Sequence, residues 1–479
     1  KNMPEWAYIG NVEISMHDSD TVYLSATRFK LSDYKPYLFK SCDSGQTWSL
    51  ISDNFPQNEI TRVIRSDIKS VGLLFVGTET GILVSNDDGK NWERMKGKLP
   101  VVPVYDLKIK DDDLVVATHG RSFWILDDIM PLRASIDEKI SLELIMPRTT
   151  IRQNIHWSAG IFNGDGKDYS PAFGVPGTSY MAESIDGKKE RKYLDTGENP
   201  PLGAIIYYWL NGNNVGKPVK ISIKDGSGAT IATCDSGNDK ESEKRKPTSY
   251  LGLNRFVWDL TENGPTSLDD SLKVKKYKPF SKEGGGPAGA KVKPGKYQVV
   301  VDIGGQNKNC ELEVISDPRI SVADEDFAEQ HDLYGRVVAK LSELNIAVNR
   351  VRLMKQQLKN MHKIMPEENK LIDELIASLD NVEGSLIDTK RETPRDVLRH
   401  EAGLDDTLIN LLWVIKIADS KPPLQTKEVT EDVFGQVDSV LSKLESLIKN
   451  EITDFNELIA KASPPTISSS SVGAPKTGW

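Results

Sequence analysis

Hydrophobic and polar positions along the 479-residue chain follow two different periods. Up to about residue 318, apolar and polar residues alternate over short stretches that are separated by turn-forming Gly, Asn, Asp and Pro residues. Alternation with a period of two predicts β-strands with one buried face. Beyond that point apolar residues recur three and four positions apart, which predicts helices. The pattern therefore predicts a multidomain chain, with an all-β first part and an α-helical second part.

Residues 1–146 contain a repeat of three apolar stretches in a fixed order. The stretches are VEISM, TVYLSAT and PYLFKS in the first unit, ITRVI, LLFVGT and GILVSN in the second, and VYDLKI, LVVAT and SFWILD in the third. The first two units continue into a tight turn and a fourth short strand. Four antiparallel strands in a unit of about 40 to 50 residues are typical of a β-propeller blade. The repeat predicts a partial β-propeller with two four-stranded blades and a three-strand remainder.

The tight turn carries the motif S-x-D-x-G-x-x-W, which recurs at an offset of 44 residues. Its members are Ser41, Asp43, Gly45 and Trp48 in the first copy, and Ser85, Asp87, Gly89 and Trp92 in the second. Glycine permits a positive φ, aspartate accepts hydrogen bonds from turn N–H groups, and tryptophan packs between blades. These roles favour a structural motif over a chemical one. The third unit has Leu126-Asp127-Asp128 at this point and lacks the glycine and the tryptophan.

Two blades and a remainder do not close a propeller, because propellers have about 4–8 blades. Alone they would leave unpaired strand edges and an exposed apolar face. We therefore expect further blades as partners, from upstream sequence of the same precursor or from another chain. Since the chain begins with Lys1 rather than Met, we expect a processed or truncated form.

The remaining residues are divided at about 318 and 464. Residues 147–318 are predicted to form an immunoglobulin- or fibronectin-like β-sandwich, with strands at 204–210, 217–225, 229–234, 253–260, 295–303 and 309–316. Residues 319–464 are predicted to form an antiparallel helical bundle, with a helix of about 35 residues from Asp324, then helices at 366–387, 394–417 and around 429–447. Residues 465–479 are rich in Ser, Pro and Gly and are predicted to form a flexible tail.

The net charge and the composition limit the classes of partner and environment that fit the chain. Lys and Arg total 61 and Asp and Glu total 70, so the net charge is −9, which argues against a nucleic-acid partner. No apolar run reaches the roughly 18 residues of a transmembrane segment. The three cysteines, Cys42, Cys234 and Cys310, are too few for a disulfide scaffold. A Cys234–Cys310 bridge and three free thiols both remain possible.

The sequence contains no self-contained catalytic motif, so the catalytic residues are unknown and no cofactor is expected. The six histidines have no metal-ligand spacing, which predicts no metal site. Residues 163–168 are predicted to be a turn rather than a calcium loop, because the ligand spacing and the terminal Glu are missing.

The geometry of a blade predicts a ligand-binding face. Successive hairpins of a blade turn at opposite ends, so the connections between second and third strands lie at the end opposite the motif turns. These connections carry Arg28, Asp33, Glu79, His119 and Arg121, a cluster suited to carboxylate groups of a sugar or a peptide. The alternative is that these side chains only satisfy loop carbonyls and acidic neighbours. For glycoside hydrolysis, Asp33 and Glu79 are the only carboxylate pair that we can nominate, and such a pair has to lie about 5–9.5 Å apart.

The repeated motif resembles the Asp box of bacterial neuraminidase (BNR) repeats, sortilin-type propellers and xyloglucanase-type propellers. The runs at 101–133, 199–210 and 252–260 resemble the C-terminal part of large secreted bacterial proteins that are labelled sortilin-like or "glycosyl hydrolase". The resemblance covers residues 5 to about 465. It implies the same domain order, a longer precursor with a signal peptide, and export to the periplasm, cell surface or medium.

Three functions follow from this resemblance and the residues together. The first is a binding or assembly module for a protein partner or a glycan, without a self-contained catalytic site. The second is part of a xyloglucanase-like glycoside hydrolase whose active site is completed by missing upstream blades. The third is a structural subunit of a cell-surface assembly.

Overall fold

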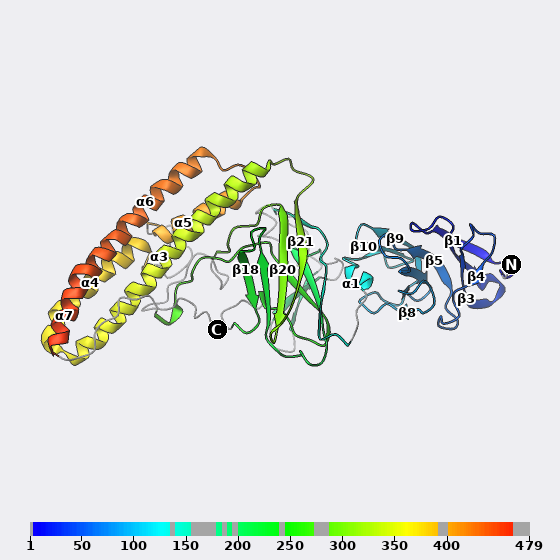
Figure 1. Ribbon diagram of the computed structural model, residues 1–479, viewed down its shortest axis with the longest axis horizontal. Helices are drawn as coiled ribbons and strands as arrows, with labels where there is room; N and C mark the ends of the chain where they lie inside the picture. The colour runs from blue at the N-terminus through cyan, green and yellow to red at the C-terminus, as the bar shows by residue number, and fades with distance from the viewer. Residues whose placement is uncertain are drawn as a thin grey trace. The chain divides into compact units, whose positions relative to one another are not determined.

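The computed structural model describes residues 3–134, 139–154, 179–183, 189–193, 200–238, 245–272, 287–390 and 401–462 (Figure 1). The chain divides into two compact units. The first comprises Lys1–Arg148, Ile206–Val215 and Tyr250–Asn254, and the second comprises Thr149–Ile205, Gly216–Ser249 and Arg255–Trp479. The predicted turn at 163–168 and the predicted tail at 465–479 lie outside the described residues.

Three antiparallel sheets follow one another along the first unit (Figure 1). Sheet 1 contains β1 (Tyr8–Ile14), β2 (Val22–Arg28), β3 (Asp33–Ser41) and β4 (Ser49–Leu50). Sheet 2 contains β5 (Thr61–Ser66), β6 (Leu74–Thr78), β7 (Ile82–Ser85) and β8 (Glu93–Arg94). Sheet 3 contains β9 (Val104–Lys110), β10 (Asp113–Thr118) and β11 (Phe123–Leu126). Strands lie side by side in chain order in every sheet, so the predicted pattern of four, four and three strands is confirmed.

The strand registers define equivalent positions in the three sheets. The first strand of each sheet carries one β-bulge residue, at Gly10, Arg62 and Tyr105. The residues two positions after the bulge occupy equivalent places in the three sheets. The residues that pair with them on the second strand, and then on the third strand, are equivalent as well. The equivalent sets are Val12, Ile64 and Leu107; Leu24, Val76 and Val116; and Phe39, Leu83 and Trp124.

Each sheet buries one face against the next. Sheets 1 and 2 share a core of Tyr23, Leu38, Phe55, Ile64, Leu74, Val76, Leu83 and Trp92. Sheets 2 and 3 share a core of Val63, Leu73, Phe75, Ile82, Val104, Leu107, Ile109, Leu114, Val116 and Ile129. Successive side chains of a strand point to opposite faces, and the residues of β6 are buried on both, so the two faces of sheet 2 lie in two different cores.

The two motif turns (residues 41–48 and 85–92) make the same hydrogen bonds. In the first, Ser41 Oγ donates to Asp43 at 2.7 Å, and Asp43 accepts from the Thr47 N–H at 2.8 Å. Gly45 has a φ of +87°, which a side chain would strain. The hydrogen bonds from Thr47 and Ser41 lower the pKa of Asp43 to about 2.

Trp92, at the end of the second motif turn, joins sheets 1 and 2. Its indole N–H donates to the Ile51 carbonyl at 2.8 Å, and its ring meets Phe55 edge-on at 5.4 Å between centroids. A buried indole that also finds an acceptor contributes both apolar contact and a hydrogen bond.

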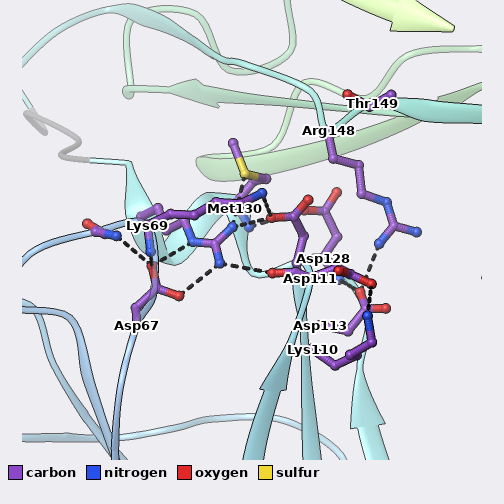
Figure 2. A network of polar contacts seen from close by, with 12 residues as sticks. Asp67, Lys69, Lys110, Asp111, Asp113, Asp128, Met130, Arg148 and Thr149 are labelled. Carbon is purple, nitrogen blue, oxygen red and sulfur yellow. Dashed lines mark hydrogen bonds and ion pairs between the residues drawn. The ribbon is translucent and has the colours of Figure 1, made fainter. Parts of the chain in front are cut away.

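The contact between sheets 2 and 3 is stabilised by the short helix α1 (Met130–Arg133) instead of a motif turn. The Arg133 guanidinium donates to both carboxylate oxygens of Asp67, at 2.9 and 2.8 Å, and also pairs with Asp112. Asp67 is fully buried and accepts from the Lys69 and Ser70 N–H groups, so it also holds the turn between β5 and β6 (Figure 2). The helix α1 follows the third strand of sheet 3, at the point of the chain where sheets 1 and 2 have their motif turns.

Strands between residues 142 and 316 form further sheets. A three-stranded sheet has the order β12 (Leu142–Ile145), β16 (Ala204–Leu210), β19 (Gly252–Trp258). A five-stranded sheet has the order β13 (Thr150–Arg152), β21 (Gln306–Ser316), β20 (Gly295–Ile303), β17 (Val219–Lys224), β18 (Thr230–Asp235). A hairpin pairs β14 (Ser179–Glu183) with β15 (Lys189–Tyr193). Six of these strands were predicted within a few residues, whereas β12 to β15 were not.

Helices follow from residue 324. They are α3 (Asp324–Ile364), α4 (Asn369–Leu386), α5 (Leu404–Lys416), α6 (Leu424–Leu447), a π-helical turn at Ile448–Ile452, and α7 (Thr453–Ala462). They share one hydrophobic core, which includes Val337, Leu379, Leu412 and Val437. The predicted helix from Pro394 to Ile417 has to be corrected, because residues 401–403 are not helical and α5 begins at Leu404; residues 391–400 lie outside the described part. None of the described helices is long and apolar enough to cross a membrane.

The cysteines resolve the alternative that the sequence left open. Cys42, Cys234 and Cys310 are all free thiols, so Cys234 and Cys310 are not bridged. Burial raises the pKa of Cys310 to about 12, which keeps this thiol protonated and unreactive.

Candidate functional site

Side chains from all three sheets of the first unit meet at Arg62. Its guanidinium lies between two aromatic rings, 4.9 Å from the centroid of Phe29 and 4.8 Å from that of Tyr105. Phe29 follows β2, while Arg62 and Tyr105 are the equivalent bulge residues of β5 and β9. A bulge re-aims a side chain at the end of a strand, which accounts for the meeting of these two residues.

Two of the predicted site residues join this stack. The ring of His119 lies parallel to Tyr105, with 5.0 Å between centroids and 10° between planes. Glu79 accepts a hydrogen bond from Arg62 Nε at 2.5 Å and forms an ion pair with the same guanidinium. Arg62 therefore links the connection that carries Glu79 with the one that carries His119. We call Phe29, Arg62, Glu79, Tyr105 and His119 the Arg62 cluster.

Arg28 and Asp33, which were also predicted, form an ion pair at 2.9 Å beside this cluster. Tyr37 donates its hydroxyl hydrogen to Asp33 at 2.7 Å. This hydrogen bond, the Lys35 N–H and the charge of Arg28 hold the pKa of Asp33 below its ordinary value. Because Phe29 directly follows Arg28, the pair and the cluster occupy one end of the sheets.

Arg121 is the fifth predicted residue, and only its backbone is anchored. Its N–H donates to Thr118 Oγ1 at 3.1 Å, and its carbonyl accepts from the Trp124 indole at 2.9 Å. Its side chain is exposed, and its guanidinium has no ion pair among the described residues. Arg121 is thus a cation that a ligand can reach without breaking an internal contact.

Glu59 stabilises the turn that carries Glu79. This buried carboxylate accepts hydrogen bonds from Thr78 and Thr80, and it pairs with Arg94 at 3.0 Å. Sequence reasoning missed Glu59, Arg62 and Tyr105. The bulge positions are the signal that could have found the last two, but a bulge is set by pairing between strands rather than by a local motif.

The electrostatics favour binding over proton transfer. A glycosidase acid needs a raised pKa, whereas the pKa of Asp33 is lowered and Glu79 lies against a guanidinium. No group of three or more His, Cys, Asp or Glu side chains is arranged to hold a metal ion within the described residues. The exposed side chains at this end include His119, Arg121 and Tyr105, together with Lys30 and Lys35, which follow β2.

Comparisons with known proteins give only distant likenesses. No family model matches the chain, and no curated protein matches it. Among solved structures, YCF48 from Cyanidioschyzon merolae is 14% identical, with 67% of this chain and 87% of that chain covered and a TM-score of 0.20. YCF48 bound to D1 peptide is 14% identical over 46% of this chain and half of that one, also with a TM-score of 0.20.

A xyloglucanase of glycoside hydrolase family 74 from Xanthomonas campestris is 13% identical, with 65% of this chain and 58% of that chain covered and a TM-score of 0.20. Likenesses at this TM-score carry no argument about function.

Proposed function

We propose that sheets 1, 2 and 3 are consecutive blades of a β-propeller, and that the chain is a binding and assembly module of an exported protein. The observation that carries this proposal is the Arg62 cluster, in which the Arg62 side chain of sheet 2 also contacts Phe29 after β2 of sheet 1 and Tyr105 of sheet 3. In this proposal the strands of residues 147–318 form an immunoglobulin-like sandwich and the helices form an antiparallel bundle. The motif turns are Asp boxes of a sortilin-like protein.

The ligand of this face is a protein segment or a glycan that carries carboxylate groups. Asp33 and Glu79 already neutralise Arg28 and Arg62, so these four side chains shape the surface rather than attract charge. Arg121 keeps its positive charge free, and the open face of the His119 ring can stack on a planar group or a sugar ring. Charge-assisted hydrogen bonds from arginine are among the stronger contacts to a carboxylate.

The assembly part of the proposal follows from blade number. Three sheets are fewer than the 4–8 blades of a propeller. The remaining blades come from upstream sequence of the same precursor or from another chain.

A glycoside hydrolase completed by missing blades is the second candidate, because Asp33 and Glu79 both lie on this face. Their ion pairs do not favour it. Asp33→Asn and Glu79→Gln separate the candidates: unchanged hydrolysis of xyloglucan removes both residues from the chemistry, and a loss of turnover in either supports the hydrolase.

The binding function is tested with two acidic probes, a polyglutamate peptide and an oligogalacturonate, measured by calorimetry on the whole chain. The double variant His119→Ala/Arg121→Ala is expected to weaken binding of at least one probe about tenfold, because a charge-assisted hydrogen bond contributes roughly 1.5–3 kcal/mol. The control is Lys110→Ala, which removes an exposed cation that pairs with Asp111 at the last residue of β9, at the other end of sheet 3, and it is expected to change nothing. Equal affinity of the double variant and the control for both probes would refute the proposal.

A further inference from the structure

The end of the sheets that carries the Arg62 cluster is locally positive. Residues 28–35, which follow β2, contain the cations Arg28, Lys30 and Lys35 and one carboxylate, Asp33, which pairs with Arg28. Lys30 and Lys35 are exposed and form no ion pair among the described residues. Because the chain as a whole has a net charge of −9, this positive charge is a property of one face, which a polyanionic ligand would recognise.

The exposed cations lie on both sides of Arg62. Arg121 is in the connection between β10 and β11 of sheet 3, whereas Lys30 follows β2 of sheet 1. The Arg62 guanidinium of sheet 2 lies between these sheets, 4.9 Å from the ring of Phe29, which precedes Lys30, and 4.8 Å from the ring of Tyr105 on sheet 3. The cations therefore form a row across three sheets and are not gathered in one pocket.

Exposed aromatic rings accompany these cations. Tyr8 pairs with Thr27 at the end of β2, so it lies at the same end of sheet 1, and Lys30 Nζ is 6.0 Å from the centroid of its ring. Tyr8, Tyr34 and Tyr105 are 63%, 49% and 48% exposed. An aromatic ring can pack on the C–H face of a sugar ring while the hydroxyl and carboxylate groups of the sugar stay in water. The face therefore offers ring surfaces beside its cations.

The main chain of the connections is already hydrogen-bonded within the protein. The N–H groups of Glu79 and His119 donate to the carbonyls of Ile60 and Pro103 at 3.1 and 2.9 Å, and the N–H of Arg121 is also used. An extended peptide is often held by main-chain hydrogen bonds, which these three groups do not offer. A ligand of this face is therefore recognised through side chains, which favours a sugar polymer over a peptide.

We propose that the ligand of this face is a linear polyuronate, an acidic polysaccharide whose carboxylates pair with Arg121 on one side of Arg62 and with Lys30 and Lys35 on the other. Each residue of such a polymer carries one carboxylate and one sugar ring, which matches a row of cations and exposed rings. Its backbone is stiffer than that of a peptide, so less conformational freedom is lost on binding. This inference rests on the proposed function, because it names the ligand class of the same face.

Calorimetry on the whole chain tests the ligand class. The probes are hexagalacturonate and a hexaglutamate peptide with blocked ends, which carry the same number of carboxylates. Hexagalacturonate is expected to bind at least about tenfold more tightly than hexaglutamate. Trigalacturonate is expected to bind more weakly than hexagalacturonate, because a shorter chain reaches fewer of the cations. The methyl ester of hexagalacturonate has no charge and is expected not to bind.

A pair of lysine variants tests whether the ligand crosses the face. Lys30→Ala/Lys35→Ala is expected to weaken hexagalacturonate binding about fivefold, because two exposed ion pairs are lost. It is also expected to reduce the advantage of hexagalacturonate over trigalacturonate. Lys90→Ala/Lys110→Ala is the matched control, since it removes two exposed lysines at the other end of sheets 2 and 3, and it leaves the affinity unchanged. All four lysines are exposed, so both variants are expected to keep the wild-type circular dichroism.

The outcomes separate this inference from the proposed function. Hexaglutamate that binds as tightly as hexagalacturonate, and that His119→Ala/Arg121→Ala weakens, would overturn the polyuronate and leave the binding function intact. Hexagalacturonate binding that Lys30→Ala/Lys35→Ala does not change would overturn the inference as well, because the ligand would then not cross the face. If no acidic probe binds the chain, both the inference and the proposed function are wrong.

Discussion

At the scale of single residues, burial and hydrogen bonding decide which titratable groups are available for binding and which lower the stability of the folded chain. Lys291 in the second unit is a group of the second kind, because its charged form is disfavoured in the folded chain. Its ammonium donates to the Gln153 carbonyl, next to the buried Arg152 guanidinium. Burial, with a further contribution from the charge of Arg152, lowers the pKa of Lys291 to about 8.

This pKa predicts a rise in stability with pH. The unfolded chain keeps the Lys291 proton up to its ordinary pKa near 10.5, whereas the folded chain releases it near 8. The folded state is penalised below pH 8, and the penalty is relieved as the pH rises from 8 to about 10.5. Urea denaturation at pH 7.5 and pH 10 is expected to show a gain of up to about 3 kcal/mol relative to Lys291→Met, which lacks the proton. The exposed Lys293→Met is the control and retains the wild-type gain; an equal pH response in all three proteins would contradict this account.

Residue roles were predictable from the sequence only where a local motif sets them. The motif turns fix Asp43 and Gly45 through bonds to residues two to four positions away. Arg62 has no such motif, because its partners Phe29 and Tyr105 lie on other sheets. Lys291 reads as an ordinary surface lysine in the sequence, since nothing local indicates its burial.

At the scale of elements, α1 takes the place of the third motif turn. A charged side chain with a planar fork can hold two carboxylates at once, and Arg133 does so with Asp67 and Asp112. The side chains of Arg133 and Asp67 are 6% and 0% exposed, so this ion pair is isolated from solvent. The neighbouring pair of Arg148 with Asp113 is more exposed (Figure 2).

Arg133→Ala is expected to destabilise the chain by about 3 kcal/mol, because it leaves the Asp67 carboxylate buried without its cation. Arg148→Ala removes an ion pair of the same network and is expected to cost less than about 1 kcal/mol. Urea denaturation at pH 7 measures both. A cost for Arg133→Ala no larger than that for Arg148→Ala would show that α1 does not hold sheet 3 on sheet 2.

Helices and strands were predicted accurately where the spacing of their apolar residues is regular over many positions. The long apolar rows of α3 and the alternation of β20 and β21 are unambiguous, and these elements lie where the sequence places them. The strands β12 and β13 were missed because they are only three or four residues long, too short to show alternation. The helix at 394–417 was predicted to be continuous, whereas residues 401–403 are not helical and α5 begins after Gly403.

At the scale of the whole molecule, the first unit is a repeat of three sheets, and only sheet 2 has a neighbouring sheet on both faces among the described residues. Trp48 and Trp92 occupy the same motif position, but their surroundings differ. Trp92 is packed between two sheets, whereas Trp48 covers Leu24 and Phe39 on the outer face of sheet 1. The sequence predicts the same packing role for both tryptophans. The difference between their surroundings depends on which neighbouring sheet is present.

Substitution of the two tryptophans is therefore expected to have unequal effects. Trp92→Ala should cost about 3–5 kcal/mol, the range for a buried tryptophan that leaves a cavity. Trp48→Ala should cost clearly less at protein concentrations where the chain is monomeric. Denaturation of both variants at low concentration measures the difference, and equal costs would mean that the outer face of sheet 1 is already closed.

A cryo-electron microscopy map of the assembled protein shows whether sheets 1, 2 and 3 are consecutive blades of one ring. The account predicts a closed ring in which another sheet lies about 10 Å from the face that carries Val12. A map in which the faces that carry Val12 on sheet 1 and Phe123 on sheet 3 both border solvent, or in which sheets 1, 2 and 3 do not continue into a ring, would contradict it.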